Sequence, residues 1–396
     1  MTELHPGIHW VGAEEWGLEY FHGHELSIRH GTSYNSYLIM DDKIALIDTV
    51  KGPHAAKFVE QVSALVPLEK IDYFIVLHSE PDHSGAFPLI MEKAKNAKIL
   101  CSKNGALSLK RHYPGEWDIT VMKTNESISL GKRSFTFFEA PMLHWPDSMF
   151  AYCPQDKILF SNDAFGQHLA SSSRFTDEVD QCLLWNEAVK YFANILTPYS
   201  PHIIKKIKEF AALGWPVESI YTSHGLLWRK DPMAIVNKYL EWAEGKAASA
   251  AVILFDTIWH GTERMAHAIA RGVQAEGVAY RMFNAGSADF NDVMTEVLLS
   301  KGVLVGSPTL NNGLMPTLMP SMESLRNLRF PKKIGAAFGT YGWSGEGVKR
   351  IEEFLTGGGI KIAQPALRVQ FSPTPADLVQ CETFGRGFAK ILKEQG

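Results

Sequence analysis

Short apolar runs alternate with helix-like stretches along the first 245 residues of the chain. Apolar or alternating segments predict strands at 35–40 and 43–48, which Asp41-Asp42 separates as a tight-turn pair. Further strands are predicted at 71–77, 98–101, 134–139, 149–152, 157–160 and 219–222, and helices at 54–66, 86–95, 184–196, 201–213 and 232–244. This mixture predicts an α/β sandwich with sheets inside and helices outside.

A more regular alternation follows the small-residue stretch 245–250, which we take as the domain boundary. Strands are predicted at 251–255, 279–283, 302–306 and 334–338, each followed by a helix, the helices starting near Thr262, Asp289, Pro316 and Gly345. A last strand at 360–362 or 366–369 precedes a helix from Thr374. Five β/α units predict a doubly wound parallel sheet. We therefore expect one domain over 1–248 and another over 249–396.

Composition narrows the class of protein and its partners. With 45% hydrophobic and 21% charged residues, the 396-residue chain has the composition of an ordinary globular protein. A net charge of −4 gives no electrostatic argument for nucleic acid or an anionic membrane as a partner. No apolar run approaches the roughly 20 residues that span a bilayer, and the start lacks the features of a signal peptide. We expect a cytoplasmic protein.

The four cysteines are scattered along the chain, at Cys101, Cys153, Cys182 and Cys381. No C-x-x-C pair is present, so the sequence contains neither an iron–sulfur motif nor a rubredoxin-type iron site. In a reducing compartment, we expect these residues to be free and mostly buried thiols.

Four potential metal ligands directly follow the apolar run 71–77. They are His78, Glu80, Asp82 and His83. Packing does not explain this cluster, because crowded charged and imidazole groups are unfavourable unless a cation or hydrogen-bond partners compensate them. Two carboxylates and two imidazoles suit a divalent transition metal, and they favour iron or manganese over ions that prefer thiolates.

Three further candidates follow other predicted strands: His144, Asp163 and His224. Sites in α/β domains gather at the carboxyl edge of the sheet, so these side chains are expected near the first four. The set is large enough for two metals and a bridging carboxylate. Taken alone, each histidine would more often be structural, and Asp163 would more often cap a helix. The remaining histidines, including His112, His202 and His267, are expected to be surface or structural residues.

The order His-x-Glu-x-Asp-His, then His, Asp and His at strand ends, resembles the metal motif of flavodiiron proteins. In that family a metallo-β-lactamase-like αββα sandwich precedes a flavodoxin-like domain. The resemblance covers essentially the whole chain and extends to the stretches 21–23, 32–35, 142–148 and 162–168. Hydrolases of the same superfamily carry His where Glu80 stands and usually hold zinc, whereas a carboxylate oxygen suits iron.

Residue by residue, the resemblance implies two non-haem irons. His78, Glu80 and His144 would hold one iron, Asp82, His83 and His224 would hold the other, and Asp163 would bridge them. His22 and Tyr191 resemble residues that reach the open, substrate side of the diiron pocket. An ordinary turn histidine and helix tyrosine explain them equally well. Direct binding of iron by His83 is left open.

Three loops at the carboxyl edge of the second sheet predict a site for FMN. A hydroxyl-bearing loop at a helix N-terminus favours a phosphate, glycines let the backbone approach a planar ring, and Trp343 can stack on that ring. Trp259 and His260 depart from the flavodoxin pattern Ser/Thr-x-Thr-Gly-x-Thr, and the G-x-G-x-x-G fingerprint of dinucleotides is absent. The candidate residues are Thr257, Ile258, Trp259, His260, Gly261, Thr262, Ser307, Pro308, Thr309, Leu310, Asn311, Asn312, Gly339, Thr340, Tyr341, Gly342, Trp343 and Ser344.

The resemblance implies an oxidoreductase that reduces O2 to water, NO to N2O, or both. It also implies a head-to-tail homodimer, or a dimer of dimers, in which the FMN of one subunit lies beside the diiron site of the other. The chain has neither a rubredoxin domain nor a nicotinamide motif, so an external donor is expected, either rubredoxin or reduced F420. The choice of gas, of donor and of dimer or tetramer stays open.

Two other functions are compatible with parts of the sequence. One is a zinc-dependent hydrolase with the metallo-β-lactamase fold, which Glu80 and the flavin loops argue against. The other is an FMN electron-transfer protein whose metal site is only structural.

Overall fold

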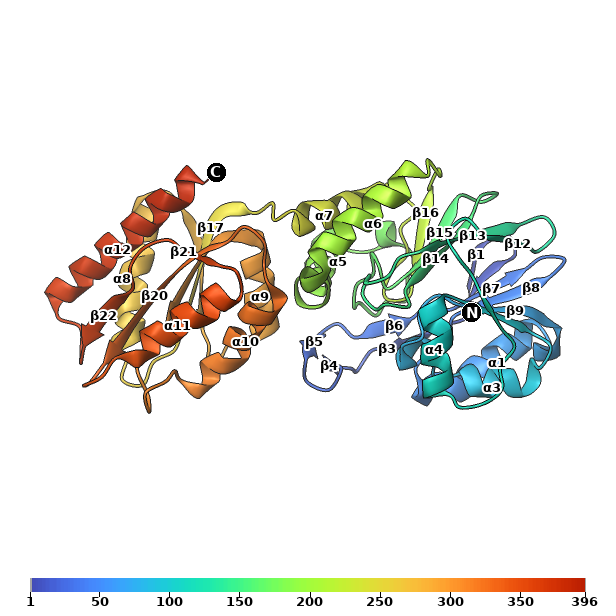
Figure 1. The fold of residues 1–396 in the computed structure, drawn as a ribbon, viewed down its shortest axis with the longest axis horizontal. Helices are drawn as coiled ribbons and strands as arrows, with labels where there is room; N and C mark the ends of the chain where they lie inside the picture. The colour runs from blue at the N-terminus through green and yellow to red at the C-terminus, as the bar shows by residue number, and fades with distance from the viewer. Residues whose placement is uncertain (1, 396) are drawn as a thin grey trace. The chain divides into compact units, whose positions relative to one another are not determined.

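The computed structural model describes residues 2–395 and divides them into two compact units. Unit 1 comprises residues 2–191 and Pro201–Leu240, and unit 2 comprises Phe192–Ser200 and residues 241–395. Figure 1 shows both units with most of their helices and strands labelled. Within the described residues, no helix combines the length and apolar character needed to cross a lipid bilayer.

Two sheets stack face to face in unit 1. The first has the strand order β1-β2-β7-β8-β9-β10-β11, and the second has the order β12-β13-β14-β15-β16. The strands of the first sheet are β1 (Thr2–His5), β2 (Ile8–Trp10), β7 (Tyr37–Met40), β8 (Ile44–Ile47), β9 (Ile71–Val76), β10 (Lys98–Cys101) and β11 (Ile119–Val121). Those of the second are β12 (Ser127–Ser129), β13 (Ser134–Glu139), β14 (Met149–Cys153), β15 (Ile158–Asn162) and β16 (Ser219–Thr222).

The core of unit 1 lies between these sheets. Ile75 and Leu77 from the first sheet meet Phe135, Phe160 and Tyr221 from the second in one buried cluster. Helices cover the outer faces, with α1, α3 and α4 by the first sheet and α5, α6 and α7 by the second (Figure 1). The helices are α1 (Ala55–Leu65), α2 (Pro81–Ser84), α3 (Phe87–Lys93), α4 (Lys103–His112), α5 (Gln181–Tyr191), α6 (Ser200–Ala212) and α7 (Met233–Ala243). This arrangement confirms the predicted sandwich.

Several short elements of unit 1 were not predicted. They are β1, β2, β11, β12, α2, α4, and two small hairpins, β3 (Ala13–Glu15) with β6 (Thr32–Tyr34) and β4 (Tyr20–Phe21) with β5 (Leu26–Ser27). Strands of two to four residues are too short to show a hydrophobic period. The helix predicted at 184–196 stops at Tyr191 and continues as a π-helical segment, η4 (Phe192–Leu196). Asp163 caps no helix, because a turn follows it.

Unit 2 contains one parallel sheet with the order β18-β17-β19-β20, and both β21 and β22 pair with β20. Its strands are β17 (Ala248–Phe255), β18 (Ala279–Asn284), β19 (Ser300–Gly306), β20 (Ile334–Tyr341), β21 (Lys361–Ile362) and β22 (Leu367–Gln370). Both alternatives for the last strand are therefore present. When the strands are numbered from 1 at β17, their order in the sheet is 2-1-3-4-5. Flavodoxin-like folds have this order, which confirms the predicted doubly wound sheet.

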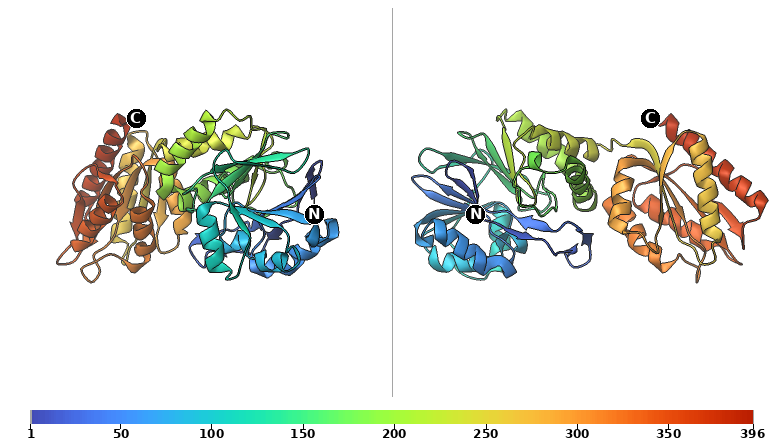
Figure 2. Two further views of the ribbon diagram at one scale, coloured as in Figure 1. Left: turned by 45° about the vertical axis from the view of Figure 1, so that its right-hand side comes forward. Right: turned by 180° about the vertical axis from the view of Figure 1, so that it is seen from behind.

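Helices cover both faces of this sheet. Figures 1 and 2 show α8 (Gly261–Ala275) and α12 (Pro375–Glu394) side by side on one face. The other helices are α9 (Phe290–Leu299), α10 (Met319–Leu328) and α11 (Glu346–Gly357). Met265 and Phe388 join the sheet residues Ile253 and Leu304 in the core. The loops after β17, β19 and β20 share the carboxyl edge of the sheet, where flavodoxin-like folds bind their ligand.

Candidate metal centre and flavin cavity

The seven predicted metal ligands of unit 1 come together at the carboxyl ends of its strands. The first four follow β9, His144 lies in the loop between β13 and β14, Asp163 follows β15, and His224 follows β16. All seven side chains are buried. Their ligand atoms form two groups that could each hold a metal ion: His78, Glu80, His144 and Asp163 in one, and Asp82, His83 and His224 in the other.

The carboxylate of Asp163 lies between the two groups. Its Oδ2 is 3.1 Å from Nε2 of His144 and 3.6 Å from Nε2 of His78. Its Oδ1 is 2.9 Å from Nε2 of His83 and 3.6 Å from Nε2 of His224. One oxygen therefore faces each pair of imidazoles, which is the geometry of a bridging carboxylate.

Each group has one further carboxylate. Oε2 of Glu80 lies 3.0 Å from Nε2 of His78, and Oδ2 of Asp82 lies 3.2 Å from Nε2 of His224. Oδ2 of Asp82 also lies 3.3 Å from Nε2 of His83. In each group, the possible ligand atoms all lie within 4.8 Å of one another.

Several polar atoms in this cluster lack hydrogen-bond partners among the described residues. Both carboxylate oxygens of Asp82, both ring nitrogens of His83 and Oδ1 of Asp163 are buried and unsatisfied. Buried polar atoms are nearly always paired, so these atoms call for another partner. Three carboxylates with four imidazoles form the oxygen-and-nitrogen ligand set that suits iron. The residues therefore fit a pair of irons.

The charges in the cluster stabilise one another. Burial raises the pKa of Asp163, but the charge of His83 and a hydrogen bond from His144 outweigh burial and hold the pKa well below its ordinary value. Burial lowers the pKa of His83, but the charges of Asp82 and Asp163 raise it to about 9. The pocket therefore favours ionised carboxylates, which is the form that binds a cation.

Hydrogen bonds from outside the cluster orient two of the imidazoles. Nδ1 of His78 lies 3.1 Å from Oδ1 of Asp147, and Nδ1 of His224 lies 2.7 Å from the carbonyl oxygen of Ser33. Because an ionised carboxylate and a carbonyl only accept hydrogen bonds, each Nδ1 is the donor, and Nε2 of each ring is directed at the cluster. Asp147 is part of the family-like stretch 142–148, but the sequence did not assign it a role.

The two predicted substrate-side residues lie at different distances from the cluster. Nε2 of His22 is 2.9 Å from Oε1 of Glu80. Burial lowers the pKa of His22, but hydrogen bonding to Glu80 outweighs burial and raises it. Tyr191 is buried, with its ring 5.0 Å from that of His168 and 6.4 Å from that of His224.

Sequence reasoning missed His168 as a neighbour of the cluster. Its ring lies 4.7 Å from that of His224, and its Nδ1 lies 2.8 Å from Oγ1 of Thr32. Burial and the charge of His224 hold the pKa of His168 well below its ordinary value, so it is neutral. The sequence contained one indication of this role, because His168 is the last residue of the family-like stretch 162–168. Of the other histidines, His112, His202 and His267 are exposed.

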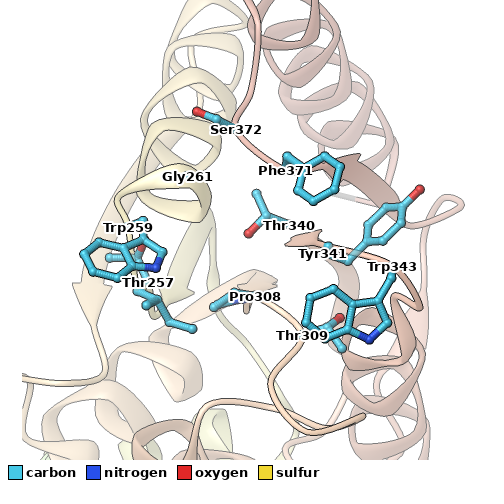
Figure 3. Close-up of a pocket in the computed structure, with 12 residues that line it drawn as sticks. Thr257, Trp259, Gly261, Pro308, Thr309, Thr340, Tyr341, Trp343, Phe371 and Ser372 are labelled. Atoms are coloured by element: carbon cyan, nitrogen blue, oxygen red, sulfur yellow. The ribbon is translucent and has the colours of Figure 1, made fainter.

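A cavity of about 330 Å³ lies at the carboxyl edge of the sheet in unit 2 (Figure 3). Figure 3 shows Trp259 on one side of it and Trp343 on the opposite side. Both indoles are almost fully exposed, at 88% and 89%. The predicted residues that line the cavity are Thr257, Ile258, Trp259, Gly261, Pro308, Thr309, Thr340, Tyr341, Gly342 and Trp343, and Phe371 and Ser372 line it in addition.

The other predicted flavin residues support the loops instead of lining this cavity. Oγ1 of Thr262 lies 2.9 Å from Oγ1 of Thr340, and the Ser307 hydroxyl donates to the Pro308 carbonyl at 2.8 Å. His260 has a φ of 59° at the start of α8. Leu310, Asn311, Asn312, Gly339 and Ser344 also lie outside the lining.

The residues of the cavity fit FMN. The N-terminus of α8 borders the cavity, and the hydroxyl of Thr257 beside it is buried without a hydrogen-bond partner. A phosphate at this position would accept from that hydroxyl and from the first backbone N–H groups of the helix. Aromatic side chains on both sides suit a planar ring. Phe371 and Ser372, which follow β22, were missed because their strand is not one of the three that the sequence linked to the ligand.

Comparisons with known proteins give one consistent result. Residues 32–225 match the family described as ODP family beta lactamase, and residues 253–385 match the flavodoxin family. The chain is 48% identical to the nitric oxide reductase of Moorella thermoacetica, with 98% of each chain covered. It is 42% identical to the anaerobic nitric oxide reductase flavorubredoxin of Aeromonas hydrophila, over 97% of this chain and 78% of that protein.

Solved structures agree with the sequence relatives. The rubredoxin oxygen:oxidoreductase of Desulfovibrio gigas superposes with a TM-score of 0.97 at 38% identity, covering 100% of this chain and 99% of that one. The flavodiiron protein of Giardia intestinalis superposes with a TM-score of 0.94 at 34% identity, covering 100% and 97%. Together with the β-lactamase-like and flavodoxin-like folds, these matches show that the chain is an oxidoreductase of the flavodiiron protein family.

Proposed function

We propose that this protein reduces O2 to water, NO to N2O, or both, at two irons held by the seven-residue cluster. The observation that carries the proposal is the position of Asp163, whose two oxygens face two different pairs of imidazoles. A single structural metal would not need a carboxylate that reaches two ligand groups. The proposed ligands are His78, Glu80 and His144 for one iron and Asp82, His83 and His224 for the other.

The reactions set the electron and proton requirements. Reducing O2 to two waters consumes four electrons and four protons, and coupling two NO to N2O and water consumes two of each. When bound, two ferrous ions and reduced FMN together supply up to four electrons at a Lewis-acidic site. FMN is proposed to bind in the cavity between Trp259 and Trp343.

His22 is proposed to serve the proton requirement. Its Nε2–H donates a hydrogen bond to Oε1 of Glu80. The other carboxylate oxygen of Glu80, Oε2, faces the cluster. The imidazole is 37% exposed, so it connects the buried carboxylate to solvent. Tyr191 is proposed to limit the space beside His168 and His224 on the substrate side.

The first experiment is anaerobic stopped-flow mixing of the fully reduced protein with O2 and, separately, with NO, with headspace N2O quantified. Faster oxidation by O2 with little N2O would identify an oxygen reductase. Faster consumption of NO with one N2O per two NO would identify a nitric oxide reductase. The proposed function is refuted if neither gas oxidises the reduced protein faster than it oxidises free flavin.

Two ligand variants and a matched control test the site. Glu80→Ala and Asp163→Ala should lose iron and turnover while they retain FMN. Glu218→Ala removes an exposed carboxylate that pairs with Lys157 on the surface and should change neither. Metal analysis of the same samples separates this proposal from a zinc hydrolase. Turnover that survives both ligand variants would favour an electron-transfer protein with a structural metal site.

We further propose that the protein works as a homodimer, or a dimer of dimers, in which FMN of one subunit reduces the irons of the other. The exposure of Trp259 and Trp343 at the flavin cavity supports a partner surface there. Activity should fall on dilution into monomers, and turnover that does not depend on concentration across that transition would contradict the dimer.

The electron donor and the domain limits are also proposals. Rubredoxin and reduced F420 are the two candidate donors, and an assay of the purified protein with each one would distinguish them. We propose residues 1–248 as the diiron domain and residues 249–396 as the FMN-binding domain. A location in the cytoplasm stays a prediction from the sequence.

A further inference from the structure

A second cavity, of about 280 Å³, lies within unit 1 between the sheet strands β14 to β16 and the helices α6 and α7. Its lining is almost entirely apolar and includes Phe150, Phe165, Phe210 and Val236. The lining side chains with a charge or an amide are Lys206 and Asn237. The ammonium of Lys206 is 2.8 Å from a carboxylate oxygen of Glu209, so its charge is already balanced.

The inner wall of this cavity is formed by residues next to two candidate iron ligands. Leu143 directly precedes His144, and Phe165 follows Asp163 by two residues. Both side chains are nearly inaccessible to water, at 1% and 2% exposed. The ring of Phe165 packs near those of Phe150 and Tyr239, with centroids 6.3 Å and 4.8 Å away. Two apolar side chains therefore stand between the cavity and the backbone that carries the ligands.

This cavity opens to solvent on its outer side, because Ala211 and Met233 of its lining are exposed. Its inner side is bounded by buried side chains such as Ile220. Water on an apolar lining finds few hydrogen-bond partners, so small apolar molecules such as xenon can displace it. The neutral lining would not attract an ion or a highly polar ligand, whereas a neutral diatomic gas loses little on leaving water.

We propose that this cavity binds the diatomic substrate, O2 or NO, before it reaches the metal cluster. The inference rests on the proposed function for the identity of the gas. Leu143 and Phe165 separate the cavity from the cluster, and small rotations of their side chains admit the gas. The cavity raises the local concentration of an apolar substrate next to the segments that carry His144 and Asp163. Charged and strongly polar solutes are excluded by the same lining.

Two neighbouring alanines of α6 provide a matched test. Ala211 lines the cavity, whereas Ala212, the last residue of the same helix, lies outside the lining. Both are exposed, so both should accept a larger side chain without loss of folding. Ala211→Trp is expected to fill part of the cavity, and Ala212→Trp is the control. Ala211→Phe is a smaller alternative if the indole disturbs packing.

The first readout is the position of xenon in crystals of the holoprotein under xenon pressure. Xenon should occupy the cavity in the wild-type protein and in Ala212→Trp, and should be absent from Ala211→Trp. The second readout is stopped-flow oxidation at low gas concentration. Its second-order rate constant should fall roughly tenfold in Ala211→Trp alone, because the gas can then enter only when protein motions open another path. Iron and FMN content should stay at the wild-type level.

Xenon binding requires neither iron nor turnover, so the two proposals can fail separately. A wild-type cavity without xenon would overturn the gas site even if the protein reduces O2 or NO rapidly. Equal rate constants in Ala211→Trp and the wild-type protein would overturn its role on the substrate path. If the wild-type protein reduces neither gas, the proposed function fails, and xenon occupancy alone decides whether the cavity is an apolar gas site.

Discussion

Replacement of Asp147 by Asn tests whether one hydrogen bond from outside the cluster prepares the metal centre. Oδ1 and Oδ2 of Asp147 lie 3.1 and 3.2 Å from Nδ1 of His78, and Oδ2 accepts from the backbone N–H and hydroxyl of Ser79 at 2.7 and 2.6 Å. Burial raises the pKa of Asp147, but the charge and hydrogen bond of His78 outweigh burial and lower it to about 2. The carboxylate is therefore ionised and keeps the proton of His78 on Nδ1.

The size of the effect follows from the loss of this charge. Asn retains the shape of Asp and an oxygen that accepts from Ser79, but its amide carries no charge to hold the imidazole proton. Loss of such an outer partner typically lowers metal affinity about 10- to 100-fold. This range corresponds to roughly 1.4–2.7 kcal/mol of binding free energy. Affinity for Fe²⁺ should fall by this amount in Asp147→Asn.

Affinity is measured by competition between the metal-free protein and a coloured ferrous chelator, under anaerobic conditions, with FMN content as a measure of folding. The matched control is Asp156→Asn. Asp156 is half-buried and accepts from Nε of Arg133 at 2.6 Å. It precedes β15, so it lies at the opposite end of that strand from Asp163. The reasoning is refuted if both variants lose affinity equally, or if Asp147→Asn loses none.

Three further predictions concern the flavin loop, a buried lysine and the metal itself. A Cβ at Gly339 would lie 2.0 Å from the carbonyl oxygen of Ser307, whereas a Cβ at Gly342 would make only an ordinary van der Waals contact. In an equilibrium titration, Gly339→Ala should therefore bind FMN more weakly, and Gly342→Ala should bind it as the wild-type protein does. Burial lowers the pKa of Lys333 from 10.5 to about 7, so the unfolded state binds more protons than the folded state between these values. The free energy of unfolding should therefore rise from pH 7 to 10 by about 3–4 kcal/mol relative to Lys333→Met. Urea unfolding followed by flavin fluorescence measures this difference, and parallel pH profiles would contradict it. Removal of iron should lower the midpoint of thermal unfolding, by an amount equivalent to about 3 kcal/mol for each of the two irons when free iron had been at a hundredfold excess over its dissociation constant.

The amino-acid sequence was sufficient for the main elements of the fold and for the chemistry of the site. The strands β13 and β16 coincide with the predicted ranges 134–139 and 219–222. Long elements such as α12 were found because their hydrophobic period and capping residue Thr374 are local signals. The ligands after β9 were visible for the same reason, since four of them occur within six residues.

Other features could be decided only by tertiary structure. The two-sided position of Asp163 depends on the register of β15 with β16 and on how the two sheets of unit 1 stack. The contacts of Asp147 with His78 and of His168 with His224 join residues 69 and 56 positions apart in the chain. The choice between two last strands could not be made locally, because β21 and β22 both pair with β20 at different points. Residue types and short spacings reveal which groups can bind a metal or a flavin. The distances between these groups result from packing between strands that are far apart in the sequence. Local sequence patterns do not predict that packing.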